Sequence, residues 1–362
     1  MAGNSNLGAA KAAKNDEFYT KWDDIESEMQ AYLEYNPDVF RGKTILLPCD
    51  DPDWSNFTKY FTEHFGQLGL KKLISTSYAA DGGNGKVFVL EGENEPKWGH
   101  LAGDGDFRSD EVTALRDEAD MAITNPPFSL FREFMVWLVE GGVEFSVIGN
   151  MNAITYKEIF PLIKGNEMWL GASRMGAKCF ALPSNAPVKA SQREENGVRF
   201  QKFGNIAWFT NIEHGRRHEP LVLMTMEDNL IYGSKKVRSA GYPKYDNYDA
   251  IEVPITAGIP SDYEGVMGVP ISFLDKYNPE QFEILGSRRW GKSQELLDVY
   301  TGTVVPPEND KKTLINGKET YDRIFIRHRN PGRKEPQLLS RSRGGQSSLR
   351  CKRGLSHVEV RG

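Results

Sequence analysis

The sequence predicts an α/β protein built on a doubly wound, mostly parallel sheet. Through the first 150 residues, short apolar runs of strand length alternate with segments of helical spacing, which is the pattern of a parallel sheet with helices on both faces. One of these runs, residues 121–124, stops at two consecutive prolines and leads directly into a helical segment. Such a strand, turn and helix place a site at the carboxyl edge of the sheet. The length of 362 residues leaves room for a second domain.

Helical and strand-like segments alternate through this first half. Apolar residues recur at helical spacing over 22–33, and residues 43–48 form a continuous apolar run typical of a buried strand. A helix at 54–65 follows, with Asp53 or Ser55 near its cap. The other strands expected here are 72–78, 87–91, 121–124 and 144–149, and the other helices are 109–118 and 129–138.

After residue 153 the pattern changes, because the strand candidates become shorter and polar, Gly- and Pro-rich loops separate them. We expect a helix at 156–163 and strands at 168–170, 178–182, 206–209, 221–224 and 321–326. Residues 1–14 are small and polar, and residues 328–362 are basic with little apolar content, so we expect disorder at both ends.

Composition indicates a cytoplasmic protein with a packed core. Apolar residues make up 39% of the chain and aromatic residues 11%. No apolar run approaches the ~18 residues of a membrane span, and the N-terminus lacks the apolar stretch of a signal peptide. The three cysteines are too few and too scattered for a disulfide framework or a zinc site. We therefore expect neither a membrane partner nor a bound metal.

The charge is unevenly distributed along the chain. The net charge is −5, but residues 327–362 carry +8, which leaves −13 on the rest. An acidic body argues against indiscriminate nucleic-acid binding, so any DNA-binding face must be local. Residues 170–240 are one candidate, with 11 Lys and Arg against 6 Asp and Glu, although a solvated surface stretch often has such an excess.

The turn Asn125-Pro126-Pro127-Phe128 has side chains that suit the methylation of an exocyclic amine. The lone pair of such an amine is conjugated with its ring and is a poor nucleophile. The Asn125 side-chain oxygen and the Pro126 carbonyl are two acceptors that can grip the two N–H groups, and Phe128 can stack on the ring. The alternative interpretation is a turn that only ends a strand.

Several blocks that occur in order along the chain resemble the EcoRI-type adenine-specific DNA methyltransferases. The likeness covers roughly residues 15–327. Its blocks are Asp-Glu-Phe-Tyr-Thr at 16–20, Cys-Asp-Asp-Pro at 49–52, Gly-Asp-Phe-Arg-Ser at 105–109, Thr-Asn-Pro-Pro-Phe-Ser-Leu-Phe-Arg-Glu at 124–133, the segment 148–160, Trp-Phe-Thr-Asn at 208–211 and the segment 268–282.

This resemblance implies a Rossmann-like enzyme that methylates the N6 amine of a flipped-out adenine in double-stranded DNA. Its cofactor would be S-adenosyl-L-methionine, and neither a metal nor a covalent enzyme intermediate is needed. The residues that would contact the cofactor are Phe18, Tyr19, Thr20, Asp50, Asp51, Asp106 and Phe107. The residues that would hold the target base are Asn125, Pro126, Pro127 and Phe128. The enzyme is expected to act on DNA as a monomer, and a cognate restriction endonuclease would act separately.

The chain departs from the broader methyltransferase pattern in two ways. Cys-Asp-Asp-Pro replaces the usual glycine-rich loop after the first strand, as in the EcoRI-type family itself. No acidic residue directly ends the second strand, so the contact to the cofactor ribose is unassigned. Methylation of an RNA base or of a glutamine amide remains an alternative, because Asn-Pro-Pro-aromatic turns serve those substrates too.

One motif favours a different class of protein, a phosphate-loop ATPase. Residues 286–293, Gly-Ser-Arg-Arg-Trp-Gly-Lys-Ser, match the spacing of a phosphate-binding loop. Too little chain follows for the additional strands of such a domain, and Arg288, Arg289 and Trp290 are bulky for a loop that wraps a phosphate. Lys292 is a more plausible contact for DNA or solvent.

The cofactor and catalytic blocks are complete by Phe128, so we expect the later chain to recognise DNA. We predict a methyltransferase domain at 15–164, the remaining sheet strands and the target-recognition region at 165–327, and a basic tail at 328–362. Candidate contacts to DNA phosphates are Arg174, Lys178, Arg199, Lys202, Arg216 and Arg217. Arg216 and Arg217 form a cluster with His214 and His218. We expect no metal site there, because no carboxylate or cysteine lies at the spacing of metal ligands. Solvent-facing charges and DNA-backbone contacts are the two interpretations left open for that cluster.

Overall fold

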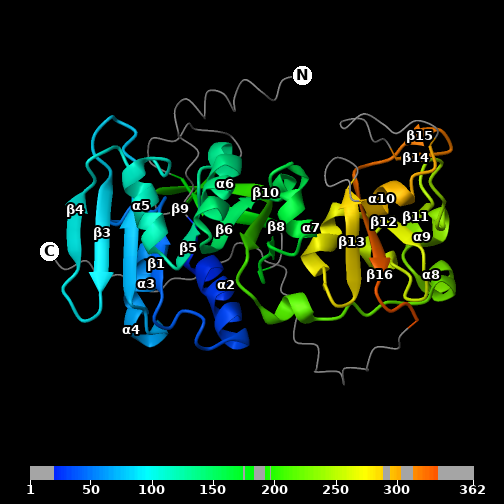
Figure 1. The fold of residues 1–362 in the computed structure, drawn as a ribbon, viewed down its shortest axis with the longest axis horizontal. Coiled ribbons are helices and arrows are strands. Elements are labelled where there is room, and N and C mark those ends of the chain that lie inside the picture. The colour runs from blue at the N-terminus through cyan, green and yellow to red at the C-terminus, as the bar shows by residue number, and fades with distance from the viewer. Residues whose placement is uncertain are drawn as a thin grey trace.

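The computed structural model describes residues 20–173, 176–182, 192–195, 197–287, 294–302 and 313–332, with the backbone alone at 176–179 and 181. Its largest element is a sheet with the strand order β4-β3-β2-β1-β5-β6-β10-β7, and β8 and β9 pair with β10 (Figure 1). These strands are β1 (Thr44–Leu47), β2 (Lys72–Thr76), β3 (Lys86–Glu91), β4 (Lys97–His100), β5 (Met121–Thr124), β6 (Glu144–Asn150), β7 (Trp169–Leu170), β8 (Gly176–Ala181), β9 (Arg193–Glu195) and β10 (Val198–Thr210).

The centre of this sheet is parallel and its two sides are antiparallel. Strands β2, β1, β5 and β6 pair in parallel. On one side β3 and β4 continue the sheet antiparallel, and on the other side β10 and β7 do so. The predicted α/β, Rossmann-like fold class is therefore confirmed.

Helices cover both faces of the sheet, because alternate residues of each central strand face opposite sides. Ile45 and Leu47 of β1 belong to one buried cluster with residues of α2 and α3, whereas Leu46 belongs to another with residues of α5 and α6. The helices of this lobe are α2 (Trp22–Tyr35), α3 (Asn56–Glu63), α4 (Phe65–Leu68), α5 (Asp110–Glu118) and α6 (Phe131–Gly141), with the 3-10 helix η1 (Phe128–Leu130) before α6.

Helix starts follow local capping chemistry. Ser55 caps α3, because its side chain accepts a hydrogen bond from the backbone N–H of Phe57 at 3.1 Å. Ser109 caps α5 in the same way, because its side chain accepts a hydrogen bond from the backbone N–H of Val112. Of the two predicted caps for the helix after the first strand, Ser55 is the one the structure confirms.

A second sheet forms a smaller lobe, with the strand order β11-β12-β16-β13; it lies on the right in Figure 1. Its strands are β11 (Ala250–Glu252), β12 (Val266–Pro270), β13 (Phe282–Ser287) and β16 (Arg323–His328), and a short pair is β14 (Leu314–Ile315) with β15 (Lys318–Glu319). The helical segments near this sheet are α8 (Met226–Tyr232), α9 (Lys235–Ala240), η4 (Thr256–Gly258), η5 (Ile271–Lys276) and α10 (Gln294–Asp298). The 3-10 helix η3 (Gly215–His218) instead contacts α2 of the large lobe, where the His218 ring stacks on that of Tyr35.

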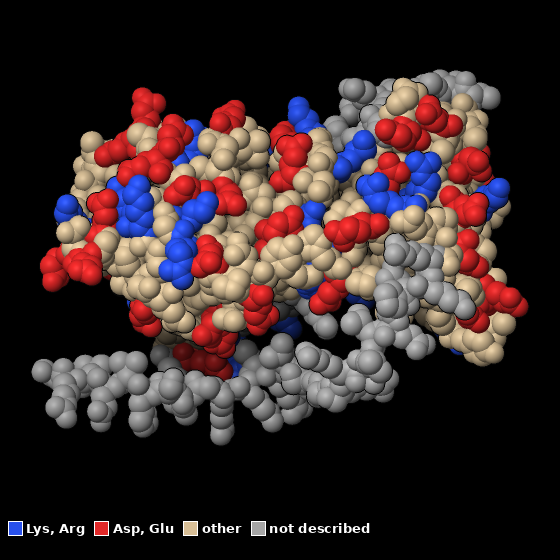
Figure 2. Space-filling view, turned by 60° about the horizontal axis from the view of Figure 1, so that its bottom comes forward, with Lys and Arg blue, Asp and Glu red and all other residues tan. Residues whose placement is uncertain are grey.

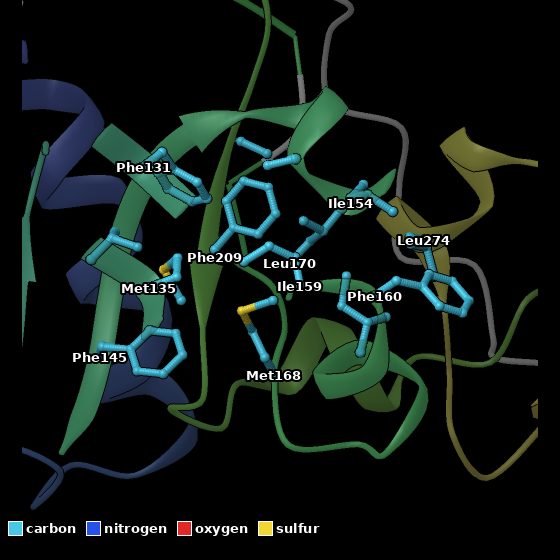
Figure 3. Packing of buried hydrophobic residues seen from close by; sticks show 14 of the residues in the cluster. Phe131, Met135, Phe145, Ile154, Ile159, Phe160, Met168, Leu170, Phe209 and Leu274 are labelled. Carbon is cyan, nitrogen blue, oxygen red and sulfur yellow. The ribbon is translucent and has the colours of Figure 1, made fainter. Parts of the chain in front are cut away.

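One continuous apolar core joins the two lobes. Between them lie η2 (Met151–Thr155) and α7 (Phe160–Lys164). Phe209 of the large sheet, Phe160 of α7 and Leu274 of η5 belong to the same buried cluster, part of which is drawn in Figure 3. The lobes therefore share buried apolar surface, which stabilises their junction.

The structure corrects two predicted elements. The helix expected at 156–163 begins only at Phe160, because Pro161 fits the first turn of a helix and not its interior. The strand expected at 221–224 is not a strand. Instead the Gln281 side chain accepts from the Leu221 N–H at 2.8 Å and donates to the Leu221 carbonyl at 3.0 Å. None of the helices in the described ranges is both long and apolar enough to cross a bilayer.

Candidate active site

The Asn-Pro-Pro-Phe turn lies in the middle of the carboxyl edge of the large sheet. Strand β5, which runs between β1 and β6, ends at Thr124 as predicted. Asn125 follows directly and is only 6% exposed. Pro127 precedes η1, so the chain turns at once from the strand into the α6 segment. This position is where open α/β sheets bind their ligands.

Asp50 connects this turn to the loop after β1. The Thr124 hydroxyl donates to Asp50 Oδ2 at 2.6 Å, and the Ser55 hydroxyl donates to Asp50 Oδ1 at 2.6 Å. The pKa of Asp50 is raised to about 7, mainly by burial and in small part by the charge of Asp51, against the lowering effect of the two hydrogen bonds. A carboxylate buried here is held by donors on two different elements.

A pocket beside the turn brings together blocks that are far apart in the sequence. Its walls come from the ends of β1 and β2, from the loop before α5 and from the segment after β5. The lining residues are Pro48, Cys49, Tyr78, Gly105, Asp106, Phe107, Pro127 and Leu130. Asp106 and Phe107, predicted to contact the cofactor, thus lie next to Pro127 of the predicted base-binding turn.

Two residues of this pocket, Cys49 and Tyr78, were not singled out by sequence reasoning. Each follows the carboxyl end of a parallel strand, β1 for Cys49 and β2 for Tyr78. Their positions after parallel strands were the signal that could have identified them.

The other predicted cofactor residues are held by the protein in different ways. Asp51 pairs with Lys86 of β3 at 2.9 Å. Asp106 forms an ion pair with Arg108 at 2.7 Å, and Arg108 also pairs with Glu133 of α6. These pairs fix the two loops that flank the pocket.

Thr20 is buried, and its carbonyl accepts from the Asn56 side chain at 2.8 Å. Thr20 is thereby tied to the start of α3, next to the loop after β1. Phe18 and Tyr19 lie outside the described residues, so their predicted contacts stay predictions.

Phe128 packs against aromatic residues of the antiparallel side of the sheet. Its ring makes edge-on contacts with Phe180 of β8 and Phe203 of β10, with centroids 6.4 and 6.3 Å apart. Phe180 and Phe203 also contact each other at 5.8 Å. The predicted stacking ring is thus oriented by strands that belong to the later part of the chain.

The predicted DNA contacts fall in two places. Lys202 is exposed and Arg199 half-buried on β10. Arg174 and the side chain of Lys178 lie outside the described residues. Acidic and basic side chains are interspersed on the face shown in Figure 2, without a continuous basic band.

Arg216 and Arg217 lie at the junction of the lobes. Arg216 donates to the Ala172 carbonyl at 2.8 Å and pairs with Asp275 of η5 at 2.8 Å. Arg217 is 4% exposed and lies over the Trp169 ring. His214 is 2% exposed, and burial lowers its pKa. The interpretation as solvent-facing charges is therefore wrong for Arg217 and His214, and phosphate contacts by the two arginines stay predictions.

The motif at 286–293 does not begin as a phosphate-binding loop. Gly286 and Ser287 are the last residues of β13 and pair with Phe325 and Ile324 of the antiparallel strand β16. The first glycine of such a loop has to be in the turn that follows a parallel strand. Residues 288–293, Lys292 among them, lie outside the described part of the chain.

Comparison with known proteins defines the class to which this fold and site belong. The family model described as "Adenine-specific methyltransferase EcoRI" matches residues 6–97 and 93–329. The chain therefore belongs to the EcoRI family of adenine-specific methyltransferases.

Individual relatives cover almost the full length of the chain. It is 40% identical to the type II methyltransferase M.EcoRI of Escherichia coli, over 91% of this chain and 98% of the relative. It is 37% identical to the type II methyltransferase M.MpnI of Mycoplasma pneumoniae, over 88% of this chain and 97% of that relative. No solved structure matches the chain.

Proposed function

We propose that this protein binds S-adenosyl-L-methionine and transfers its methyl group to the N6 amine of adenine in double-stranded DNA. Membership of the adenine-specific methyltransferase family supports the reaction. The observation that carries the assignment of the site is the pocket in which Asp106, Phe107 and Pro127 meet. A cofactor in that pocket would lie directly beside the turn that is suited to hold an exocyclic amine.

The pocket has the chemistry for a nucleoside-bearing cation. Phe107 and Tyr78 offer aromatic surface to an adenine ring, and the Asp106 carboxylate can accept hydrogen bonds from polar groups of the cofactor. When bound, the cofactor supplies a methyl group on an electrophilic sulfonium. The chain positions this group by fixing the loop after β1 and the loop before α5 through ion pairs.

The turn activates the amine by orienting it. The Asn125 side-chain oxygen and the Pro126 carbonyl accept its two N–H groups and free its lone pair from the ring. Phe128, whose own ring is held by Phe180 and Phe203, stacks on the base. Because Asn125 is buried, the adenine has to leave the helix to reach it, at a cost of a few kcal/mol that the new contacts offset.

Recognition of the DNA sequence belongs to residues 165–327, and Arg199 and Lys202 are candidate phosphate contacts. This segment includes β7, β8 and β10 of the large sheet as well as the small lobe. The test exchanges residues 165–327 as a whole with those of a relative of different target sequence, so that every predicted recognition residue is replaced. Methylation of the relative's sequence by the chimera is expected, and methylation of the original sequence by a folded chimera would contradict this assignment.

The reaction is tested by following tritium from labelled S-adenosyl-L-methionine into duplex DNA, RNA and protein. Label is expected in DNA, as N6-methyladenine after digestion to nucleosides. The control is Asn125→Ala, which should bind the cofactor with wild-type affinity and transfer no label. Labelling of RNA or protein alone would contradict the proposal. A separately acting endonuclease and a monomeric state on DNA remain predictions.

A further inference from the structure

Asp50 sits where the cofactor side and the base side of the proposed site meet. One carboxylate oxygen accepts from Ser55 and the other from Thr124. Thr124 is the residue directly before Asn125, so its position limits where the Asn125 side chain can be. Ser55 is the cap of α3 and follows the loop that forms one wall of the pocket.

This contact extends by hydrogen bonds to the first sequence block. Asn56, next to Ser55, donates to the carbonyl of Thr20 at 2.8 Å. Residues 20, 50 and 124 therefore belong to one connected set of contacts. Each of these residues lies in, or next to, a different block of the predicted site.

The backbone of Asp50 is held as firmly as its side chain. Its N–H donates to the Thr76 carbonyl at 2.9 Å, and its carbonyl accepts from the Ser75 hydroxyl at 2.6 Å. The Ser75 hydroxyl is itself 2.7 Å from that of Thr58 in α3. A carboxylate anchored in this way cannot follow Thr124 if the turn shifts, so it resists such a shift.

We propose that Asp50 is a positioning residue, whose carboxylate aligns the base-gripping turn through Thr124 with the cofactor loop through Ser55. This inference rests on the proposed methyl transfer. It assigns Asp50 a role that does not require the carboxylate to touch the cofactor, because both of its oxygens already accept hydrogen bonds from protein hydroxyls. Removal of the Thr124 hydroxyl should leave cofactor binding intact and misalign the amine.

The test compares Thr124→Val, which keeps the shape and loses the hydroxyl, with Thr124→Ser, which keeps the hydroxyl. The matched control is Thr210→Val, because Thr210 is also buried and donates to a backbone carbonyl, that of Phe145, away from the pocket. We expect Thr124→Val to lose about 10- to 100-fold in kcat, the size of effect that a small misplacement of reacting groups produces. Cofactor Kd by calorimetry should stay within about twofold of wild type, since the cofactor loop is unchanged.

Thr124→Ser and Thr210→Val should both keep a kcat close to that of the wild type. The proposal is overturned if Thr124→Val has the kcat of Thr210→Val, or if Thr124→Ser loses as much as Thr124→Val. Should Thr124→Val fail to fold, Asp50→Asn makes the same comparison, and a wild-type kcat in that variant overturns the proposal. Absence of DNA methylation by the wild type would instead refute the proposed function.

Discussion

At the scale of the residue, Asp50 shows how the site uses a buried carboxyl group. Its side chain accepts two hydroxyl hydrogen bonds, yet burial raises its pKa from an ordinary value near 3.8 to about 7. The desolvation of the ionised form therefore outweighs the two hydrogen bonds and is reinforced by the charge of Asp51. A group of this kind makes the stability of the fold depend on pH.

We expect the free energy of unfolding to fall as the pH rises from about 4 to about 7, relative to Asp50→Asn. Below this window Asp50 is protonated in both the folded and the unfolded chain. Within it the unfolded chain releases a proton that the folded chain keeps, so stability is lost at up to about 1.4 kcal/mol per pH unit. Above this window Asp50 is ionised in both states, so the difference in unfolding free energy between the two proteins no longer changes with pH.

The measurement is urea unfolding of both proteins across this pH range. The Asp50→Asn protein lacks the titrating group, so all other groups cancel in the difference between the two curves. A difference that does not change with pH would show that Asp50 has no raised pKa in the folded protein.

At the scale of the element, the loop between β4 and α5 depends on a close backbone approach. Gly105 has φ +81°, and a Cβ there would meet the Ser77 carbonyl oxygen at a distance of 2.2 Å. Gly85 approaches the same carbonyl, and a Cβ on it would meet that oxygen at 2.5 Å. The segment that carries Asp106 and Phe107 is thus packed directly on the end of β2.

We predict that Gly105→Ala destabilises the protein and weakens cofactor binding, because the loop has to move away from Ser77. Gly82→Ala is the matched control, since Gly82 also has φ +81° but has nothing within 4 Å of its Cβ position. The control should cost about 1 kcal/mol for the backbone conformation alone. Gly105→Ala should cost clearly more in thermal unfolding and raise the cofactor Kd, and equal effects of the two substitutions would contradict this packing.

At the scale of the whole molecule, the two lobes are joined by a shared core and by polar contacts. Arg216 bridges the Ala172 carbonyl of the large lobe and Asp275 of the small lobe. In the same loop, the backbone N–H groups of Ala172 and Ser173 donate to Glu28 of α2. This loop precedes β8, whose Phe180 contacts the Phe128 ring.

Arg216 and Lys202 are expected to behave differently when each is replaced by Ala. Arg216→Ala should lower the midpoint of thermal unfolding, because the Ala172 carbonyl and the Asp275 carboxylate lose their partner at the junction. Lys202→Ala should leave stability unchanged and reduce the slope of log Kd for DNA against log salt by roughly one, as for one lost phosphate contact.

Both quantities can be measured for each variant by calorimetry and by DNA titration at several salt concentrations. A reduced salt slope with unchanged stability for Arg216→Ala would assign it to a DNA phosphate, as the sequence predicted. An unchanged slope for Lys202→Ala would remove Lys202 from the DNA-binding surface.

Features that depend on local chemistry could be predicted from the sequence alone. Strand β5 ends at Thr124 because prolines follow. The start of α3 was predicted to lie near Asp53 or Ser55, because either side chain can accept from the first free N–H groups, and alternating segments indicate a parallel sheet. The order of the sequence blocks also identified the family.

Which of these features meet in space depends on packing between elements that are far apart in the sequence. The bond between Thr124 and Asp50 joins residues 74 positions apart, and the burial of Arg217 depends on two lobes that pack together. Tyr78 lines the pocket because it follows β2, which ends beside β1 in the parallel sheet. Residues 221–224 have a strand-like composition, but the side chain of Gln281 bonds the backbone of Leu221, and the Ser261 N–H donates to the Met224 carbonyl. Such contacts depend on strand register and on packing between elements, which no local pattern in the sequence specifies.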